Sequence, residues 1–189
     1  MSFDLQLMHG FDFHRDSGDL AGAFVTEKMD GWRVRWTGAR LFTRKGVELN
    51  PPSCFTAELP PLPLDAELFA GYGQRNAVCR LLASRVQNWR GMKLMIFDGP
   101  TLCGDFGARH EKLMGLRVGG CAEVVAMARL FSMNQLPTML ASVTSRGGEG
   151  LMISRAGAPY ASGRSNRLLK LKPQHLPEFH TRDLRCIAV

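Results

Sequence analysis

The sequence predicts one α+β domain, built mainly from antiparallel sheets with flanking helices. A chain of 189 residues can bury a substantial core. Its hydrophobic share of 45% is that of an ordinary globular protein. Short apolar runs of strand length recur between glycine- and proline-rich breaks, whereas few segments have helical spacing. We therefore expect a single domain over residues 1–189.

Residues 24–36 are predicted to form a β-hairpin. Asp30-Gly31 is a strong signal for a two-residue turn between antiparallel strands. After this turn, apolar side chains alternate with arginines, which places the two kinds on opposite faces of a strand. Lys28 is then expected at the end of the first strand, beside the turn.

The remaining elements are predicted on both sides of a proline-rich connection over residues 50–63, which has little room for a helix. Strands are expected at Leu41–Thr43, Leu64–Phe69, 94–97, 151–153 and 168–172, and the ambiguous segment 122–131 leans toward strand. Helices are expected at residues 80–89, from apolar spacing, and at Leu136–Ser145, where Pro137 lies in the first turn.

Composition excludes several classes of protein. No apolar run is long enough to span a membrane, and the first twenty residues lack a signal-peptide pattern, so we expect a cytoplasmic protein without a membrane partner. The five scattered cysteines contain no Cys-x-x-Cys pair, which argues against a disulfide framework or structural zinc. The net charge of +7 favours polyanionic partners such as nucleic acid.

Several side chains fit the chemistry of a lysine that attacks a phosphate. Such a lysine must be neutral, and cations or a metal must neutralise the phosphate. Lys28 is a candidate nucleophile, although alone it could be a solvated lysine at a hairpin mouth. Lys170 and Lys172 are two residues apart and share a strand face that could hold a phosphate. Glu67 and Glu149 could bind a metal or a ribose hydroxyl.

The order of these residues is more specific than any one of them. The series is Lys28-x-Asp30-Gly31-x-Arg33, Thr43-Arg44-x-Gly46, Asp65-x-Glu67, Phe97-Asp98, Gly148-Glu149-Gly150 and Lys170-x-Lys172. It covers about residues 24–173 and resembles the motif set of the covalent nucleotidyltransferases, which include ATP-dependent DNA ligases, RNA ligases and mRNA capping enzymes. Thr26-Glu27-Lys28, residues 146–152 and Gly163-Arg164-Ser165 are most similar to small bacterial and phage ATP-dependent DNA ligases.

This resemblance implies the ATP-grasp-like nucleotidyltransferase fold, ATP as AMP donor, Mg²⁺, and nicked double-stranded DNA as substrate. Lys28 would form the covalent lysyl-AMP intermediate. The residues implied to bind the nucleotide are Thr26, Glu27, Arg33, Arg44, Glu67, Phe97, Lys170 and Lys172. Phe97 would stack on the adenine, and the carboxylates of Glu67 and Glu149 would hold the metal, because Mg²⁺ is usually bound by few carboxylates together with phosphates.

The sequence departs from this family in two places. Ala66 stands where the family usually has glycine, a mild change. Only 17 residues follow Lys172, too few for the C-terminal oligonucleotide-binding (OB) fold of ligases, so a partner acting in trans is one expected source of that function. Three alternatives remain: an RNA ligase, a guanylyltransferase that uses GTP, and a non-catalytic nucleotide- or DNA-binding remnant. NAD is a poorer donor candidate, since only 27 residues precede Lys28.

Overall fold

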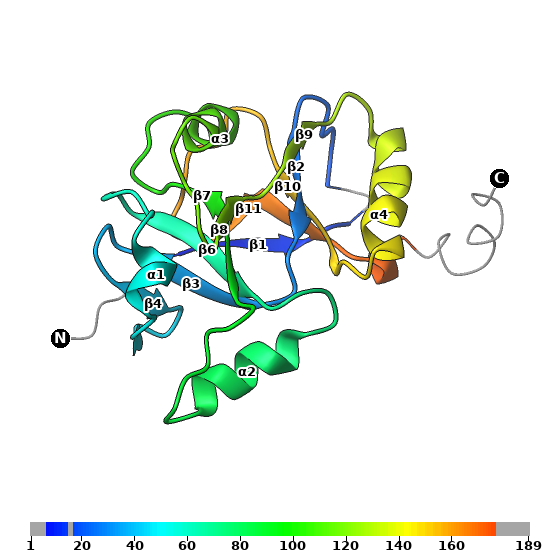
Figure 1. Ribbon diagram of the computed structural model, residues 1–189. Coiled ribbons are helices and arrows are strands. Elements are labelled where there is room, and N and C mark those ends of the chain that lie inside the picture. The colour runs from blue at the N-terminus through cyan, green and yellow to red at the C-terminus, as the bar shows by residue number, and fades with distance from the viewer. Residues whose placement is uncertain (1–6, 15–16, 177–189) are drawn as a thin grey trace.

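The structure is a computed structural model that describes residues 7–14 and 17–176. Two β-sheets with helices on their outer sides form the domain, which confirms the expected α+β class (Figure 1). The five-stranded sheet has the order β1-β11-β10-β2-β9, and the six-stranded sheet has the order β5-β4-β3-β6-β7-β8. Neighbouring strands are antiparallel except β1 with β11 and β7 with β8.

The chain begins in the five-stranded sheet with β1 and β2, forms the whole six-stranded sheet from β3 to β8, and returns to the first sheet for β9 to β11. The strands are β1 (Met8–Asp12), β2 (Phe24–Lys28), β3 (Trp32–Trp36), β4 (Leu41–Thr43), β5 (Glu48–Leu49), β6 (Leu64–Phe69), β7 (Lys93–Asp98), β8 (Ala122–Val124), β9 (Met127–Arg129), β10 (Gly150–Ser154) and β11 (Gly163–Leu171). The helices are α1 (Ser53–Thr56), α2 (Arg75–Ala83), α3 (Phe106–Met114) and α4 (Leu136–Ser145), with 3-10 turns η1 (Met133–Gln135) and η2 (Pro173–His175).

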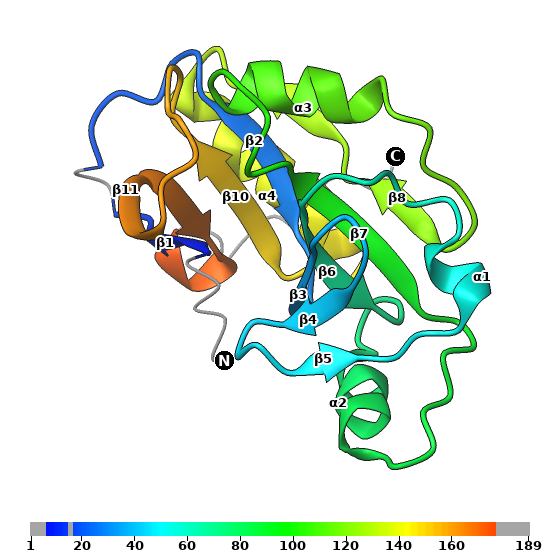
Figure 2. The same ribbon diagram turned by 90° about the vertical axis from the view of Figure 1, so that its left-hand side faces the viewer.

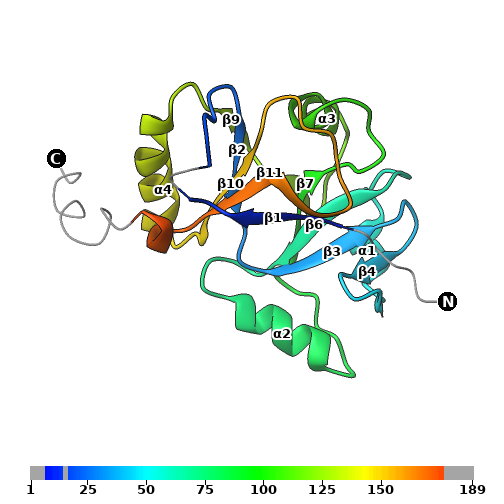
Figure 3. The same cartoon turned by 180° about the vertical axis from the view of Figure 1, so that it is seen from behind.

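Each sheet has its own hydrophobic core. Helix α4 covers the five-stranded sheet, and its Leu140 packs with buried Val25 and Ile153 (Figure 3). The six-stranded sheet buries Val34 and Ile96 with α2 and the proline-rich connection. Figure 2 shows β2 and β10 beside β6 and β7, so the faces of the two sheets that lack these helices are free to line a common cavity.

The predicted hairpin is wrong, although both of its strands exist. Strand β2 pairs with β9 and β10, whereas β3 pairs with β4 and β6 in the other sheet. Asp30-Gly31 is therefore a crossover between sheets. A Cβ on Gly31 would lie 2.1 Å from the carbonyl oxygen of Leu68, so the glycine permits close backbone approach rather than a hairpin turn. This crossover places Lys28 and Arg33 on different sheets.

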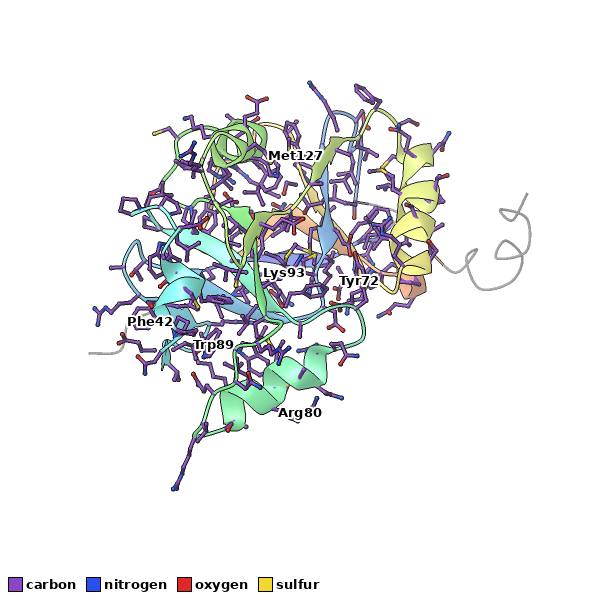
Figure 4. All side chains as sticks on the ribbon, in the orientation of Figure 1. Phe42, Tyr72, Arg80, Trp89, Lys93 and Met127 are labelled. Carbon is purple, nitrogen blue, oxygen red and sulfur yellow. The ribbon has the colours of Figure 1, made fainter. Side chains whose placement is uncertain are left out.

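The helix predicted at residues 80–89 is also misplaced. Helix α2 ends at Ala83, because Ser84 adopts an extended conformation and its hydroxyl bonds the backbone of Val86. Trp89, labelled in Figure 4, lies in a loop. Its ring is buried and packs against Phe55, with ring centroids 4.9 Å apart. The three-residue spacing between Val86 and Trp89 therefore does not mark the buried face of a helix, since Val86 is 86% exposed.

Other predictions had mixed outcomes. Helix α4 has the predicted bounds, and the strands at Leu41–Thr43 and Leu64–Phe69 are confirmed. The ambiguous segment 122–131 forms two short strands, β8 and β9, in different sheets. The proline-rich connection contains the four-residue helix α1, which was not expected. Strand β1 and helix α3 were not predicted either.

Candidate active site

A cavity of about 490 Å³ opens between the two sheets. Strands of both sheets line it, so residues far apart in the sequence meet there. Eight of the predicted site residues border the cavity: Thr26, Glu27, Lys28, Arg33, Arg44, Glu67, Phe97 and Lys170. Of the two others, Glu149 forms an ion pair with Lys28, and Lys172 forms one with Glu149. The structure thus gathers all ten predicted residues in one region.

Lys28, Glu149 and Lys172 form one charge cluster at the ends of neighbouring strands. The ammonium of Lys28 donates to one carboxylate oxygen of Glu149, and Lys172 Nζ lies 2.5 Å from the other. Burial raises the pKa of Glu149, but the hydrogen bonds from Lys172 and Lys28 outweigh it and lower the pKa below its ordinary value. The side chains are 20 to 30% exposed, so this carboxylate and its two cations remain accessible beside the cavity that Lys28 borders.

Arg33 is held rigidly on the opposite wall. Its Nε lies 2.9 Å from Oδ1 of Asp65, its second nitrogen NH2 also bonds this carboxylate, and NH1 donates to the Met8 carbonyl at 2.6 Å. The guanidinium lies 5.3 Å from the centroid of the Phe97 ring. A bidentate pair of this kind fixes both the position and the plane of an arginine. Arg33 can therefore present positive charge to the cavity without reorganising.

Asp65 and Tyr160 support Arg33 and were not predicted as site residues. Asp65 is fully buried, and Tyr160 donates its hydroxyl hydrogen to Oδ2 of Asp65 at 2.8 Å. Burial and the Asp65 charge raise the pKa of Tyr160, so it stays a neutral donor. Asp65 belonged to a recognised motif and could have been named. Nothing in the sequence signals a contact between residues 95 positions apart.

His9 is a further cavity residue that the sequence did not reveal. Its Nδ1 lies 3.4 Å from NH1 of Arg33. Burial and then the positive charges of Arg33 and Arg44 lower the pKa of His9. The side chain is therefore neutral at pH 7, and it adds a hydrogen-bonding group to the cavity without adding charge.

Thr26, Glu67 and Phe97 also line the cavity, near Lys28 and Arg33. Thr26 is 5% exposed on the same strand as Lys28. Burial raises the pKa of Glu67 to about 7, although the charges of Lys28 and Arg33 oppose this shift. Phe97 offers a partly buried aromatic ring next to Arg33. Together these groups provide an apolar surface and polar atoms that suit a nucleoside.

A second arginine-carboxylate pair lies deeper, where α3 packs against β7. Nε and NH2 of Arg109 lie 2.7 and 2.8 Å from the two oxygens of Asp98, and NH1 donates to the Gly104 carbonyl at 3.0 Å. Both side chains are almost completely buried. Burial raises the pKa of Asp98 despite the opposing hydrogen bonds and charge of Arg109. This pair holds α3 in place and adds to the cavity wall.

Two predicted residues have partners beside the cavity. Lys170 Nζ lies 3.1 Å from Oδ1 of Asp12, which is 52% exposed. The Glu27 carboxylate pairs with Arg146, with 3.1 Å between Oε2 and NH2. An exposed ion pair of the first kind is easily exchanged for a phosphate. The predicted nucleotide contacts of Lys170 and Glu27 stay predictions.

Two acidic residues suit a magnesium ion that the protein and the phosphates of a nucleotide bind together. Within residues 7–14 and 17–176, no group of three His, Cys, Asp or Glu side chains could hold a metal by itself. Mg²⁺ typically binds one or two carboxylates and completes its shell with water and phosphate oxygens. Glu67 and Glu149 supply carboxylates of that kind, one with a raised pKa and the other shared by two lysines.

Known proteins share both the sequence and the fold. No protein-family model matches the chain. The DNA ligase of Haemophilus influenzae is 31% identical over 173 residues, which are 89% of this chain and 63% of that protein. A structure from a structure-function study of Lig E DNA ligases, on DNA binding with a minimal scaffold, is 34% identical, has a TM-score of 0.80, and is matched over 88% of this chain and 68% of its own. The chain belongs to the DNA ligase family.

A solved structure with lower sequence identity to this chain has the same fold. Chlorella virus DNA ligase-adenylate superposes with a TM-score of 0.72 at 17% identity, over 88% of this chain and 68% of that one. The predicted nucleotidyltransferase fold is therefore confirmed. The chain spans 63% of the length of the Haemophilus ligase. None of the helices in the described part of the chain is long and apolar enough to span a membrane.

Proposed function

We propose that the chain is the adenylation domain of an ATP-dependent DNA ligase. Lys28 Nζ attacks the α-phosphorus of ATP, a nitrogen-phosphorus bond forms, and pyrophosphate leaves. AMP then passes to the 5′-phosphate at a nick in double-stranded DNA, and the 3′-hydroxyl displaces it. The observation that carries this proposal is the placement of Lys28 in the cavity between the sheets, with Glu149 and Lys172 beside it.

The charge cluster supports the first step. In the free protein Glu149 balances both lysines. An entering phosphate competes for Lys172, since an ammonium is a strong phosphate donor. Glu149 would then be available for a metal ion, and Lys28 attacks as the neutral amine after its ammonium proton has passed to solvent. Phosphoryl-type transfer depends mainly on position and electrostatics, which this arrangement supplies.

The remaining cavity residues take the predicted nucleotide-binding roles. Phe97 stacks on the adenine, Thr26 lies near the base, and Glu67 contacts the ribose or the metal. Arg33 and Arg44 contact the sugar and phosphates, and Lys170 with Lys172 neutralises the α-phosphate. The fixed guanidinium of Arg33 supports this assignment, because a pre-oriented cation loses little entropy when an anion binds.

ATP, Mg²⁺ and nicked DNA are the proposed co-substrate, metal and substrate. The Chlorella virus ligase of the same fold was solved as its adenylate, which supports an adenine nucleotide. Glu67 and Glu149 would hold Mg²⁺, which lowers the charge of the phosphates. Arg164 and Arg167 are exposed at the cavity rim and fit a DNA backbone. A cytoplasmic location completes the proposal.

Covalent labelling tests this function directly. The wild-type protein is incubated with α-labelled ATP and Mg²⁺, with α-labelled GTP in parallel, and separated under denaturing conditions. We expect label from ATP on the wild type and none on Lys28→Ala. Equal labelling of Lys28→Ala would contradict the assignment of the nucleophile. Absence of label on the wild type would favour a non-catalytic binding remnant, and preference for GTP would favour a guanylyltransferase.

A further inference from the structure

Two adjacent ion pairs join the segment 146–149 to the end of strand β2. At its start Arg146 binds Glu27, with 3.1 Å between NH2 and Oε2. At its end Glu149 binds Lys28. Backbone pairing of β10 with β2 continues from this point. Two consecutive residues of β2 therefore hold the two ends of the segment that brings Glu149 to the candidate nucleophile.

Arg146 also connects this segment to both sheets. Its NH1 lies 3.1 Å from the hydroxyl of Ser142 in α4, which covers the five-stranded sheet. Hydrogen bonds to Tyr72 and Glu27 raise the pKa of Arg146. Tyr72 follows β6 of the six-stranded sheet, and its ring meets Phe69 edge-on at 5.6 Å (Figure 4). Arg146 is thus the common partner of α4, β2 and the β6–α2 connection.

The glycines between Arg146 and Glu149 leave the segment little freedom to lie elsewhere. Gly147 has a φ of +86°, and a Cβ there would lie 3.2 Å from Cβ of Tyr72. A Cβ on Gly148 would lie 2.4 Å from Val143 Cγ1 and 2.8 Å from Glu27 Oε1. The segment is therefore pressed directly against the Glu27 carboxylate, and a shift of this carboxylate must move the segment.

Stability does not explain the burial of the Glu27 carboxylate. Its side chain is 14% exposed, and in the described part of the chain Oε1 is buried without a hydrogen-bond partner. A buried acceptor without a partner lowers stability. Although Glu27 is among the residues that border the cavity, strand alternation turns its side chain away from the face of β2 that Thr26 and Lys28 share. The side chain thus lies toward α4 and segment 146–149.

We propose that the Glu27–Arg146 ion pair positions segment 146–149 so that Glu149 meets Lys28 in the geometry needed for AMP transfer. Both are positioning residues, since neither contacts the nucleotide in this account. The inference rests on the proposed function, because Lys28 must be the AMP acceptor. It also replaces the nucleotide-binding role that the family resemblance implies for Glu27.

Single-turnover labelling of the full chain tests this inference. Glu27→Gln, Arg146→Gln, their double variant and Arg146→Lys are compared with wild type over a range of ATP concentrations, and thermal melting reports the folded fraction. Glu48→Gln is the matched control, because it also removes a carboxylate from an arginine ion pair. NH1 of Arg40 lies 3.3 Å from Oε2 of Glu48, and neither residue lines the cavity. Arg146 is 51% exposed, so its replacement leaves no buried gap.

We expect the maximum labelling rate of each single glutamine variant to fall roughly tenfold, since displacements of about 1 Å have cost enzymes about 100-fold. The half-saturating ATP concentration should change less than about twofold, because nucleotide contacts are intact. The double variant should be no slower than the singles, as expected for one shared interaction. Arg146→Lys should regain part of the rate, and Glu48→Gln should equal wild type.

The outcomes separate this inference from the proposed function. Wild-type rates in both single variants, multiplied losses in the double variant, or losses that match a fall in folded protein would overturn the positioning role. Each of these leaves AMP transfer to Lys28 standing. A wild-type protein that takes up no label would overturn the proposed function and the inference with it.

Discussion

Two of the cation-carboxylate groups that line or adjoin the cavity differ in burial and in the freedom of their partners. Arg109 and Asp98 form a bidentate pair that is 2% and 7% exposed, under α3. Lys28, Glu149 and Lys172 are 20 to 30% exposed, and two cations share one carboxylate. The first group holds α3 against β7 and forms part of the cavity wall with its partners fixed. The second can exchange partners when a phosphate enters, which is the property that a transfer site needs.

Breaking the buried pair should give the largest effect. Arg109→Met leaves the buried Asp98 carboxyl without its guanidinium partner, so we expect the free energy of unfolding to fall by about 3–5 kcal/mol. Urea unfolding measures this change. The matched control is Lys93→Met, because the Lys93–Glu123 pair is 60% and 59% exposed and should contribute less than about 1 kcal/mol. Similar losses in both variants would show that burial does not distinguish these pairs.

Breaking the exposed cluster should affect chemistry and leave stability nearly unchanged. Lys172→Met removes one phosphate cation, and we expect AMP transfer to slow by roughly 100-fold, as for the loss of one charge-stabilising donor. Its melting temperature should stay close to that of the wild type, because the side chain is 30% exposed. Labelling kinetics and melting curves measure the two effects. A large fall in stability with unchanged labelling would show that this cluster holds the fold and does not act in AMP transfer.

Glu67 lies between these two cases, since it is partly buried and its pKa is raised to about 7 chiefly by burial. The folded protein holds this proton more tightly than the unfolded chain does, so the stabilisation is complete below pH about 4.5 and is lost as pH rises through about 7. We expect Glu67→Gln to remove this pH-dependent change in the free energy of unfolding, which amounts to at most about 3 kcal/mol. Urea unfolding at several pH values checks it, and parallel pH profiles would refute the raised pKa.

The sequence predicted the site more fully than the path of the chain. The ordered motifs around Lys28, Glu67, Glu149 and Lys170 were sufficient to name residues that the fold gathers in one region. Motif order carries this information because the motifs lie on or beside strands that border one cavity. The hairpin prediction failed because a turn signal reports local conformation only, and the close approach of Gly31 to Leu68 of β6 depends on the tertiary structure.

Other features of the structure could not be predicted from the sequence. Helix α3 buries Arg109 and His110, so the sequence of this segment lacks the apolar spacing that predicts an amphipathic helix. Those side chains are buried only because Asp98 and the carbonyl of Val125 accept their hydrogen bonds. Partners of this kind lie 11 and 15 residues away, beyond what helical periodicity can show. The same reason hid the support that Tyr160 gives to Asp65.

The most direct measurement of the central claim is the location of the AMP adduct. After reaction with ATP and Mg²⁺, the protein is digested under conditions that preserve phosphoramidates, and peptides are sequenced by mass spectrometry. The account predicts a single AMP on Nζ of Lys28, and none on Lys170 or Lys172, which would neutralise the phosphate without attacking it. An adduct on either of those lysines, with Lys28 unmodified, would contradict it.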